Sequence, residues 1–221
     1  LRKNIFLPKP SFFPSKYEVS NQKKLAKKII NSKFKIISSN PQESIAISAK
    51  LISKGKVLGT ILGNSETGPR ALGNRSLICD GTNRLAVKFL NTIIKKRSPF
   101  RPTAPCMQED IAKKYYVIRD ELMECYKTMS ATCKCRNKSK AENFPTTHVD
   151  KTARIQIVEE GQFLNKLLNE LKKYNIEILA NSSLNLSGDP TSFDLIDTLM
   201  ISSRSPLEFI ITDFGIIELI K

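Results

Sequence analysis

The sequence predicts an α/β fold, bordering on α+β, on the basis of three observations. Residues 56–62 form a short alternating aliphatic segment that runs straight into a glycine-containing polar segment. Residues 83–96 then show apolar side chains at helical spacing. Further along, strand-like segments at 152–158 and 176–180 are separated by a helix-like segment at 163–174. Strands that alternate with helices are typical of a sheet covered by helices.

The length of 221 residues allows one sizeable domain plus an extension. No segment approaches the roughly 18 consecutive apolar residues that a membrane-spanning helix needs. The first residues show no export signal, so we expect a cytoplasmic protein without a membrane partner. Because the chain begins with Leu1, it is also compatible with the downstream part of a longer protein.

The chain carries 36 Lys and Arg against 21 Asp and Glu, a formal net charge of +15. This excess favours polyanions, anionic surfaces or phosphorylated metabolites as partners. Much of it lies in lysine-rich stretches with few aromatic residues, such as 134–140, which are typical of solvated surfaces. A nucleic-acid partner is therefore the less favoured alternative.

The five cysteines are odd in number, which indicates reduced thiols rather than a disulfide framework. Cys125, Cys133 and Cys135 form the one cluster, but they lack a CxxC pair and a nearby histidine at zinc-finger spacing. We therefore expect no metal site built by this chain.

From the N-terminus, residues 1–16 contain three prolines and are predicted to form an extended arm, followed by a helix at about 18–31. The next helix begins near Asn40, which can cap it, and stops at Gly55. We divide the chain into a possible linker region at 1–40 and a main domain at 41–221.

The C-terminal half contains the remaining predicted elements. Residues 119–145 are polar and weakly periodic, which favours a variable, partly mobile insertion. Residues 194–201 are predicted to be helical, and 209–212 and 216–220 to form paired strands.

Four polar clusters carry the candidate chemistry. The first, at 63–76, combines glycines that permit close backbone approach with Arg70 and Arg75, whose guanidinium groups match phosphate oxygens. It is not a Walker P-loop, because Asn74 stands where lysine is required. The alternative is a loop whose arginines pair with surface carboxylates.

The second cluster, at 95–104, is a basic helix end followed by a proline-stiffened turn. Two prolines flank Arg101, a rigidity that suits a group directed into a site. Lys95 and Lys96 are equally well explained by the dipole at a helix C-terminus.

The third cluster, at 147–156, contains His148, the only histidine. A lone histidine is more often structural than catalytic, but in a strand Asp150, Thr152 and Arg154 would share one face with it and line a cleft. The fourth cluster, at 181–190, follows the strand predicted at 176–180 and offers hydroxyl and amide groups suited to a ribose, phosphate or carbamoyl group. A plain turn is the alternative.

Together the clusters resemble the C-terminal domain of the O-carbamoyltransferases, which include nodulation-factor, cephamycin and aminoglycoside carbamoylating enzymes. The resemblance runs in order from about residue 43 to the end. It is carried by Gly-Pro-Arg-Ala-Leu-Gly-Asn-Arg-Ser at 68–76, Pro-Phe-Arg-Pro-Thr-Ala-Pro at 99–105, Thr-His-Val-Asp-Lys-Thr-Ala-Arg-Ile-Gln at 147–156, and Asn-Ser-Ser-Leu-Asn with Gly-Asp-Pro at 181–190.

The resemblance implies a YrdC-like domain, a twisted mixed sheet flanked by helices, similar to that of threonylcarbamoyl-adenylate synthases. Such a domain would use carbamoyl phosphate and ATP, with Mg²⁺ accompanying the nucleotide, to form carbamoyl-adenylate. A preceding Kae1-like domain, not expected in this chain, would then transfer the carbamoyl group to a substrate hydroxyl. The alternatives are an RNA-binding module and a folded but inactive fragment.

By this resemblance Arg70, Lys95, Arg101 and His148 are the expected catalytic residues. The expected substrate-binding residues are Arg75, Ser76, Asp150, Arg154, Asn181, Ser183 and Asn185. The sequence departs from the family pattern at Lys151, where glycine is expected, and also at Ser98, Thr103, Leu184 and Asp189. If position 151 needs a positive φ, Lys151 adopts it only at an energetic cost.

Overall fold

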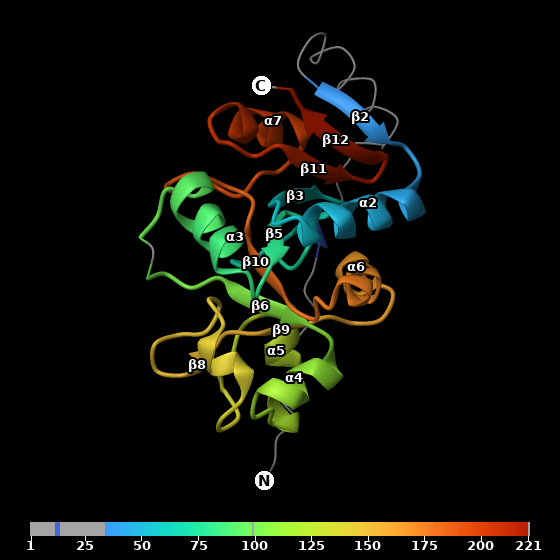
Figure 1. The fold of residues 1–221 in the computed structure, drawn as a ribbon. Coiled ribbons are helices and arrows are strands. Elements are labelled where there is room, and N and C mark those ends of the chain that lie inside the picture. Colours follow the sequence, from blue (N-terminus) through green and yellow to red (C-terminus); the bar gives the residue numbers. More distant parts are fainter. Residues whose placement is uncertain (1–11, 14–33, 99, 221) are drawn as a thin grey trace.

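The computed structural model describes residues 12–13, 34–98 and 100–220, so the helix predicted at 18–31 and most of the predicted arm lie outside the described residues. The centre of the fold is an eight-stranded mixed sheet flanked by helices (Figure 1). In spatial order its strands are β2 (Phe34–Ser38), β12 (Gly215–Leu219), β11 (Phe209–Thr212), β3 (Leu58–Ile61), β5 (Ser76–Asp80), β10 (Leu179–Ser183), β6 (Ala104–Met107) and β9 (Gln156–Ile157).

Two neighbouring pairs, β11 with β3 and β6 with β9, are parallel, and the other pairs are antiparallel. The predicted α/β class, including its borderline α+β character, is therefore confirmed. β2 belongs to this sheet through its pairing with β12. The sheet consequently includes residues that the sequence analysis assigned to the 1–40 region.

Helices cover both faces of the sheet (Figure 1). α2 (Pro41–Ser53) and α6 (Phe163–Leu171) pack on one face, and α3 (Arg84–Lys88), a π-helical segment (Phe89–Ile94) and α7 (Leu195–Ser203) pack on the other. β5 shows the alternation that this arrangement requires, because Leu77 and Cys79 enter one core and Ile78 the other.

The predicted helices begin where their capping residues stand. Asn40 accepts a hydrogen bond from the Gln42 amide and precedes Pro41 in the first turn of α2, and Asn83 caps α3 in the same way. α6 buries four leucines at spacings of three and four residues: Leu164, Leu167, Leu168 and Leu171. Each contributes about 1.5–3 kcal/mol by leaving water, which anchors α6 to the sheet.

A smaller lobe lies at the β9 end of the sheet, at the bottom of Figure 1. It contains α4 (Glu109–Tyr115), a 3₁₀ turn (Asp120–Leu122), α5 (Met123–Lys127), a second 3₁₀ turn (Lys140–Asn143), and the pair β7 (Cys133–Lys134) with β8 (Thr152–Ala153). Tyr116, Tyr126 and Ala141 are fully buried in a hydrophobic core that also includes Met107 of β6 and Ile157 of β9. The segment at 119–145, predicted to be a variable, partly mobile insertion, is therefore packed against the rest of the fold.

Three local predictions are corrected. Between the strand predicted at 56–62 and the helix predicted at 83–96, the chain forms two strands that the sequence analysis did not predict: the short β4 (Ser65–Glu66), which pairs with β1 (Phe12–Phe13), and β5, which is antiparallel to β3. The strand predicted at 176–180 lies at Leu179–Ser183, so Asn181 and Ser183 are part of it. The strand predicted at 152–158 is interrupted between β8 and β9.

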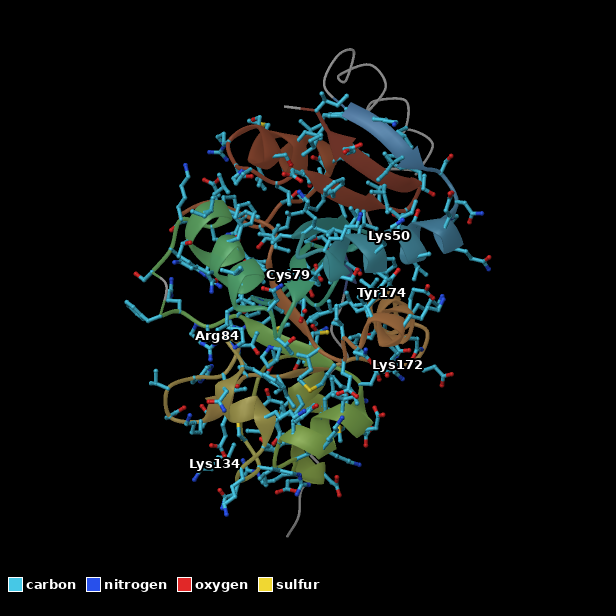
Figure 2. All side chains as sticks on the ribbon, viewed as in Figure 1. Lys50, Cys79, Arg84, Lys134, Lys172 and Tyr174 are labelled. Atoms are coloured by element: carbon cyan, nitrogen blue, oxygen red, sulfur yellow. The ribbon has the colours of Figure 1, made fainter. Side chains whose placement is uncertain are left out.

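The lysine-rich stretch at 134–140 lies on the surface, and Lys50, Lys134 and Lys172 are exposed whereas Cys79 is completely buried (Figure 2). All five cysteines are described and none is paired, as predicted. None of the described helices is both long and apolar enough to cross a bilayer.

Candidate functional site

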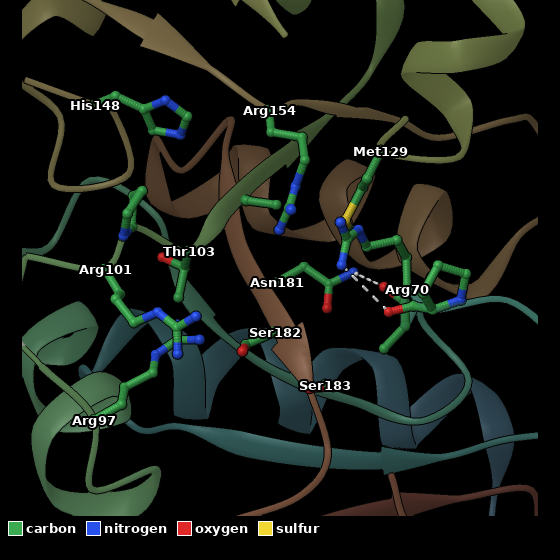
Figure 3. Close-up of a pocket in the computed structure, with 14 residues that line it drawn as sticks. Arg70, Arg97, Arg101, Thr103, Met129, His148, Arg154, Asn181, Ser182 and Ser183 are labelled. Carbon is green, nitrogen blue, oxygen red and sulfur yellow. Dashed lines mark hydrogen bonds between the residues drawn. The ribbon is translucent and has the colours of Figure 1, made fainter. Parts of the chain in front are cut away.

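A cavity of about 380 Å³ lies where β10 meets the beginning of β6 (Figure 3). Its wall is built by segments that are distant in sequence. The lining residues are Pro69, Arg70, Ala71, Arg97, Arg101, Pro102, Thr103, Ala104, Met129, His148, Arg154, Asn181, Ser182 and Ser183. We call it the arginine cavity, because four arginines and no described carboxylate line it.

The loop that carries Arg70 is shaped by one carboxylate. Glu66 Oε1 accepts hydrogen bonds from the backbone amides of Leu72 and Asn74 at 2.7 and 2.9 Å. On the cavity side, Asn181 Nδ2 donates to the Ala71 carbonyl at 3.1 Å. The loop backbone is therefore fixed from two directions, although the Arg70 side chain is exposed.

Arg97 and Arg101 follow the π-helical segment and are held by one buried amide. Asn91 Oδ1 accepts hydrogen bonds from Arg97 Nε, at 2.8 Å, and from Arg97 Nη2, and Asn91 Nδ2 donates to the Arg101 carbonyl at 3.2 Å. Burial, followed by the charges of Arg101 and Arg154, lowers the pKa of Arg97 to about 10. Arg97 therefore keeps its charge at neutral pH, but it does so beside other cations.

Arg154 approaches from the segment between β8 and β9 and points toward β10 (Figure 3). Burial and the charge of Arg70 lower its pKa. Its Nε is buried and has no hydrogen-bond partner among the described residues. A buried donor without a partner carries a free-energy cost of about 1–3 kcal/mol, which an anionic ligand would remove.

Two further unpartnered polar atoms lie on the wall of the same cavity. Thr103 Oγ1 and Asn181 Oδ1 are buried and have no partner in the described part of the chain. The orientation of Asn181 is fixed, because its Nδ2 donates both to the Ala71 carbonyl and to Gln156 Oε1. The cavity thus presents one amide oxygen, an acceptor, among guanidinium donors.

His148 is the first residue of a tight turn that the sequence did not predict. Its amide donates to the Thr152 carbonyl at 2.8 Å, and Lys151 within the turn has a φ of 62°. Lys151 therefore adopts the left-handed conformation that the departure from glycine suggested. Because 148–152 is a turn, the expected polar stripe on one strand face does not form: His148 and Arg154 line the cavity, whereas Asp150 is exposed outside it.

Non-glycine residues with positive φ concentrate around the cavity. The described residues contain five, of which Met129 lines the cavity, Lys96 precedes Arg97, and Lys151 belongs to the His148 turn. Such strain costs on the order of 1 kcal/mol or more per residue and tends to be retained at functional sites.

Of the predicted catalytic and binding residues, the arginine cavity brings together Arg70, Arg101, His148, Arg154, Asn181 and Ser183. The other predicted residues, Lys95, Arg75, Ser76, Asp150 and Asn185, do not line it. Their positions show what they do instead.

Arg75 is 1% exposed, and its guanidinium donates to the carbonyls of Phe193, Leu62, Asn74 and Gly63. Its donors are therefore committed to holding the backbone behind the loop. Ser76 is completely buried within β5.

Lys95 is 4% exposed, and its ammonium contacts the backbone and side-chain oxygens of Ser183 and Asn185. Burial, followed by the charge of Arg97, lowers its pKa to about 7. Lys95 thus supports the strand end that carries Ser183, one layer behind the cavity wall.

The candidate list from the sequence lacked Arg97, Ser182, Thr103 and Met129. Arg97 and Thr103 lie within the second polar cluster, 95–104, and Ser182 lies within the fourth, 181–190, so the clusters themselves were sufficient to suggest them. Met129 reaches the cavity from the segment that was predicted to be an insertion, and no local pattern indicated it.

A second cavity of about 590 Å³ adjoins the first and shares Pro102 and His148 with it. Its wall includes Phe100, Phe144 and Val149 beside basic residues such as Arg84 and Lys88. Among the residues that the structure describes, no group of three or more His, Cys, Asp or Glu side chains could hold a metal ion.

The family described as carbamoyltransferase C-terminus matches residues 49–218, well over half of the chain. The chain belongs to this family. The match covers every residue that lines the arginine cavity, and the resemblance inferred from the four motifs is confirmed.

Two relatives illustrate the similarity. The nodulation protein NolNO of Sinorhizobium fredii is 31% identical over 173 residues, which are 77% of this chain and 25% of that protein. The 3'-hydroxymethylcephem-O-carbamoyltransferase of Streptomyces clavuligerus is 35% identical over 154 residues, 67% of this chain and 28% of that protein. The chain thus spans about a quarter of these relatives' length.

Among solved structures, full-length HypF in a phosphate- and nucleotide-bound form matches with a TM-score of 0.51 and 18% identity, covering 71% of this chain and 23% of that chain. Sua5 of P. abyssi complexed with L-threonine matches with a TM-score of 0.55 and 16% identity, covering 80% and 48%. At such identities the likeness concerns the fold, and it confirms the predicted YrdC-like architecture.

Proposed function

We propose that this domain binds carbamoyl phosphate and ATP and forms carbamoyl-adenylate. The observation that carries the proposal is the arginine cavity itself. Four guanidinium groups converge without a described carboxylate to neutralise them, and burial combined with mutual repulsion lowers the pKa values of Arg97 and Arg154. Phosphate oxygens match guanidinium geometry and would relieve that repulsion.

Asn181 Oδ1 favours carbamoyl phosphate over an anionic ligand that has no hydrogen-bond donor. It is a buried acceptor without a partner, in a wall otherwise rich in donors. The carbamoyl NH₂ group can donate to it while the phosphate of the same molecule contacts the arginines. A ligand that lacks an N–H or O–H group would leave this oxygen unpaired at a cost of about 1–3 kcal/mol.

ATP would place its phosphates in the arginine cavity and its nucleoside in the adjoining cavity. The shared His148 and Pro102 make the two spaces neighbours, and Phe100 and Phe144 offer aromatic surface for a base. In carbamoyl-adenylate formation, water would first hydrolyse carbamoyl phosphate to carbamate and phosphate. A carbamate oxygen would then attack the α-phosphate of ATP, and pyrophosphate would leave. The arginines would neutralise the charge on the phosphate oxygens during this step, and Mg²⁺ would accompany the nucleotide.

The acceptor hydroxyl and a Kae1-like transferase domain belong to the same proposal. The relatives of this chain are about four times as long as the matched region, which is compatible with a second domain in a complete carbamoyltransferase. The sequence relationship to a named O-carbamoyltransferase supports a hydroxyl as the final acceptor.

The test follows pyrophosphate release by the purified chain with carbamoyl phosphate, ATP and Mg²⁺, together with calorimetric binding of each substrate. Arg70→Ala removes an exposed guanidinium of the cavity, and we expect it to weaken carbamoyl phosphate binding about 10-fold or more. Arg119→Ala is the matched control, because Arg119 is also exposed but does not line the cavity.

Release that is lost in Arg70→Ala and kept in Arg119→Ala would support the proposal. If neither substrate binds to a chain that melts cooperatively, the catalytic proposal is wrong. Salt-dependent binding of duplex RNA that ATP does not affect would then favour an RNA-binding module.

A further inference from the structure

The only histidine of the chain ends a short series of hydrogen bonds that begins at a carboxylate. His148 Nδ1 lies 2.9 Å from Thr152 Oγ1, which lies 2.7 Å from Asp150 Oδ1. The Thr152 amide also donates to Asp150 Oδ1, at 3.0 Å. These hydrogen bonds lower the pKa of the Asp150 carboxyl group, so at neutral pH it is ionised and can only accept.

The protons available along this series determine which nitrogen of the neutral imidazole ring carries its proton. The Thr152 hydroxyl has a single proton, and its contact with an ionised carboxylate requires that it donates that proton to Asp150. Thr152 Oγ1 can then only accept from His148, so the proton of the neutral ring lies on Nδ1. Nε2 is left with a lone pair and with no partner among the described residues.

We infer that Thr152 and Asp150 are positioning residues that hold neutral His148 in the Nδ1–H tautomer, so that Nε2 is presented to the arginine cavity as a proton acceptor. The side chains that share this wall with His148 include Arg97, Arg101 and Arg154, which can only donate. A histidine in the opposite tautomer would add one more donor. In the Nδ1–H form it supplies an acceptor for an N–H or O–H group of an anionic ligand.

This inference does not depend on which ligand the cavity binds. The turn that contains the series is rigid, because the His148 amide donates to the Thr152 carbonyl and the Lys151 amide to the His148 carbonyl, at 2.8 and 3.1 Å. The positive φ of Lys151 closes the turn and brings Thr152 back toward the ring. The strained backbone conformation of Lys151 thus helps to set the direction of one nitrogen of the His148 ring.

Long-range ¹H–¹⁵N correlation of the imidazole tests the inference directly, and His148 needs no assignment because the chain has no other histidine. At a pH where the ring is neutral, the wild-type chain should show a protonated Nδ1 and an unprotonated Nε2. Thr152→Val removes the hydroxyl at nearly constant shape, and it should shift the ring mainly to the Nε2–H tautomer, which free imidazole side chains prefer. Thr152→Ser keeps the hydroxyl and should keep the Nδ1–H tautomer.

If Thr152→Val fails to fold, a second variant can still test the inference. Asp150 is exposed, and Asp150→Ala frees the Thr152 hydroxyl to donate to Nδ1, which should lower the Nδ1–H population. A wild-type ring in the Nε2–H form overturns the inference, as does a ring that stays Nδ1–H in a folded Thr152→Val or Asp150→Ala chain. Because no substrate is added, these results are separate from the success or failure of the proposed carbamoyl-adenylate chemistry.

Discussion

The side-chain oxygen of Asn91 accepts two hydrogen bonds from the guanidinium of Arg97, and its amide nitrogen donates to the backbone of Arg101. One buried amide in a π-helical segment therefore fixes the orientation of one cavity arginine and the backbone position of another. The widened π-helical turn at 89–94 places Asn91 where both contacts can be made.

Asn91→Ala should lower the free energy of unfolding by about 1–3 kcal/mol, because it removes hydrogen bonds from a site that is 3% exposed. It should also weaken binding of carbamoyl phosphate, since Arg97 loses the contact that aims it at the cavity. Denaturant unfolding and calorimetry measure the two effects. Asn137→Ala is the control: Asn137 is exposed and lies outside the cavity, so this variant should change neither the free energy of unfolding nor the ligand affinity. Unaltered ligand affinity in Asn91→Ala would show that Arg97 takes no part in binding.

Lys151→Gly should raise the free energy of unfolding by about 1 kcal/mol, because glycine adopts a φ of 62° without the steric cost that lysine incurs. Urea unfolding measures the change. Lys50→Gly provides the contrast: Lys50 is exposed within α2, so glycine there should destabilise the fold by up to about 1 kcal/mol. If Lys151→Gly and Lys50→Gly changed the free energy of unfolding in the same direction, the positive φ of Lys151 would not explain its effect.

The stability difference between the wild-type chain and Lys95→Met should change with pH. Burial lowers the pKa of folded Lys95 to about 7, whereas the unfolded side chain keeps its proton up to a pKa of about 10.4. Between these values the unfolded state binds more protons, so the wild-type chain should gain stability relative to Lys95→Met as pH rises, by up to about 1.4 kcal/mol per pH unit. Unfolding free energies at pH 7, 8 and 9 should show this slope, and a flat difference would mean that buried Lys95 remains charged.

Carbamoyl phosphate should bind more tightly than acetyl phosphate, by about 10-fold, if Asn181 Oδ1 receives a hydrogen bond from the ligand. The two molecules have nearly the same shape, but a methyl group cannot donate, and an unpaired buried acceptor costs about 1–3 kcal/mol. Competition against a fixed concentration of either ligand measures the ratio. Equal affinities for carbamoyl phosphate and acetyl phosphate would indicate that the cavity recognises only the phosphate group.

The sequence predicted helices and strands well where their formation depends on residues that are neighbours in the sequence. Asn40 caps the helix that follows it, as predicted, and the two C-terminal segments pair as strands, as predicted. The four motifs also predicted the region of the site, because each supplies at least one residue to the arginine cavity.

The individual assignments were less accurate because burial depends on contacts that are distant in sequence. Arg75 and Arg70 belong to the same motif, but the strand direction after the loop buries the first against four carbonyl groups and leaves the second exposed. Met129 enters the cavity from a segment whose own hydrophobic core involves Tyr126, Cys133 and residues near 155, a packing that no short window of sequence reveals.

The four like charges that line the arginine cavity would also affect how long the chain survives in a cell. The charges of Arg70 and Arg101 beside the partly buried Arg97 and Arg154 lower the stability of the fold, and a ligand that binds only the folded form adds back about 2.7 kcal/mol at 100 times its dissociation constant. Fewer molecules would then open transiently to proteases when the anion is abundant. The supply of substrate would in this way help to determine how much of the protein a cell retains.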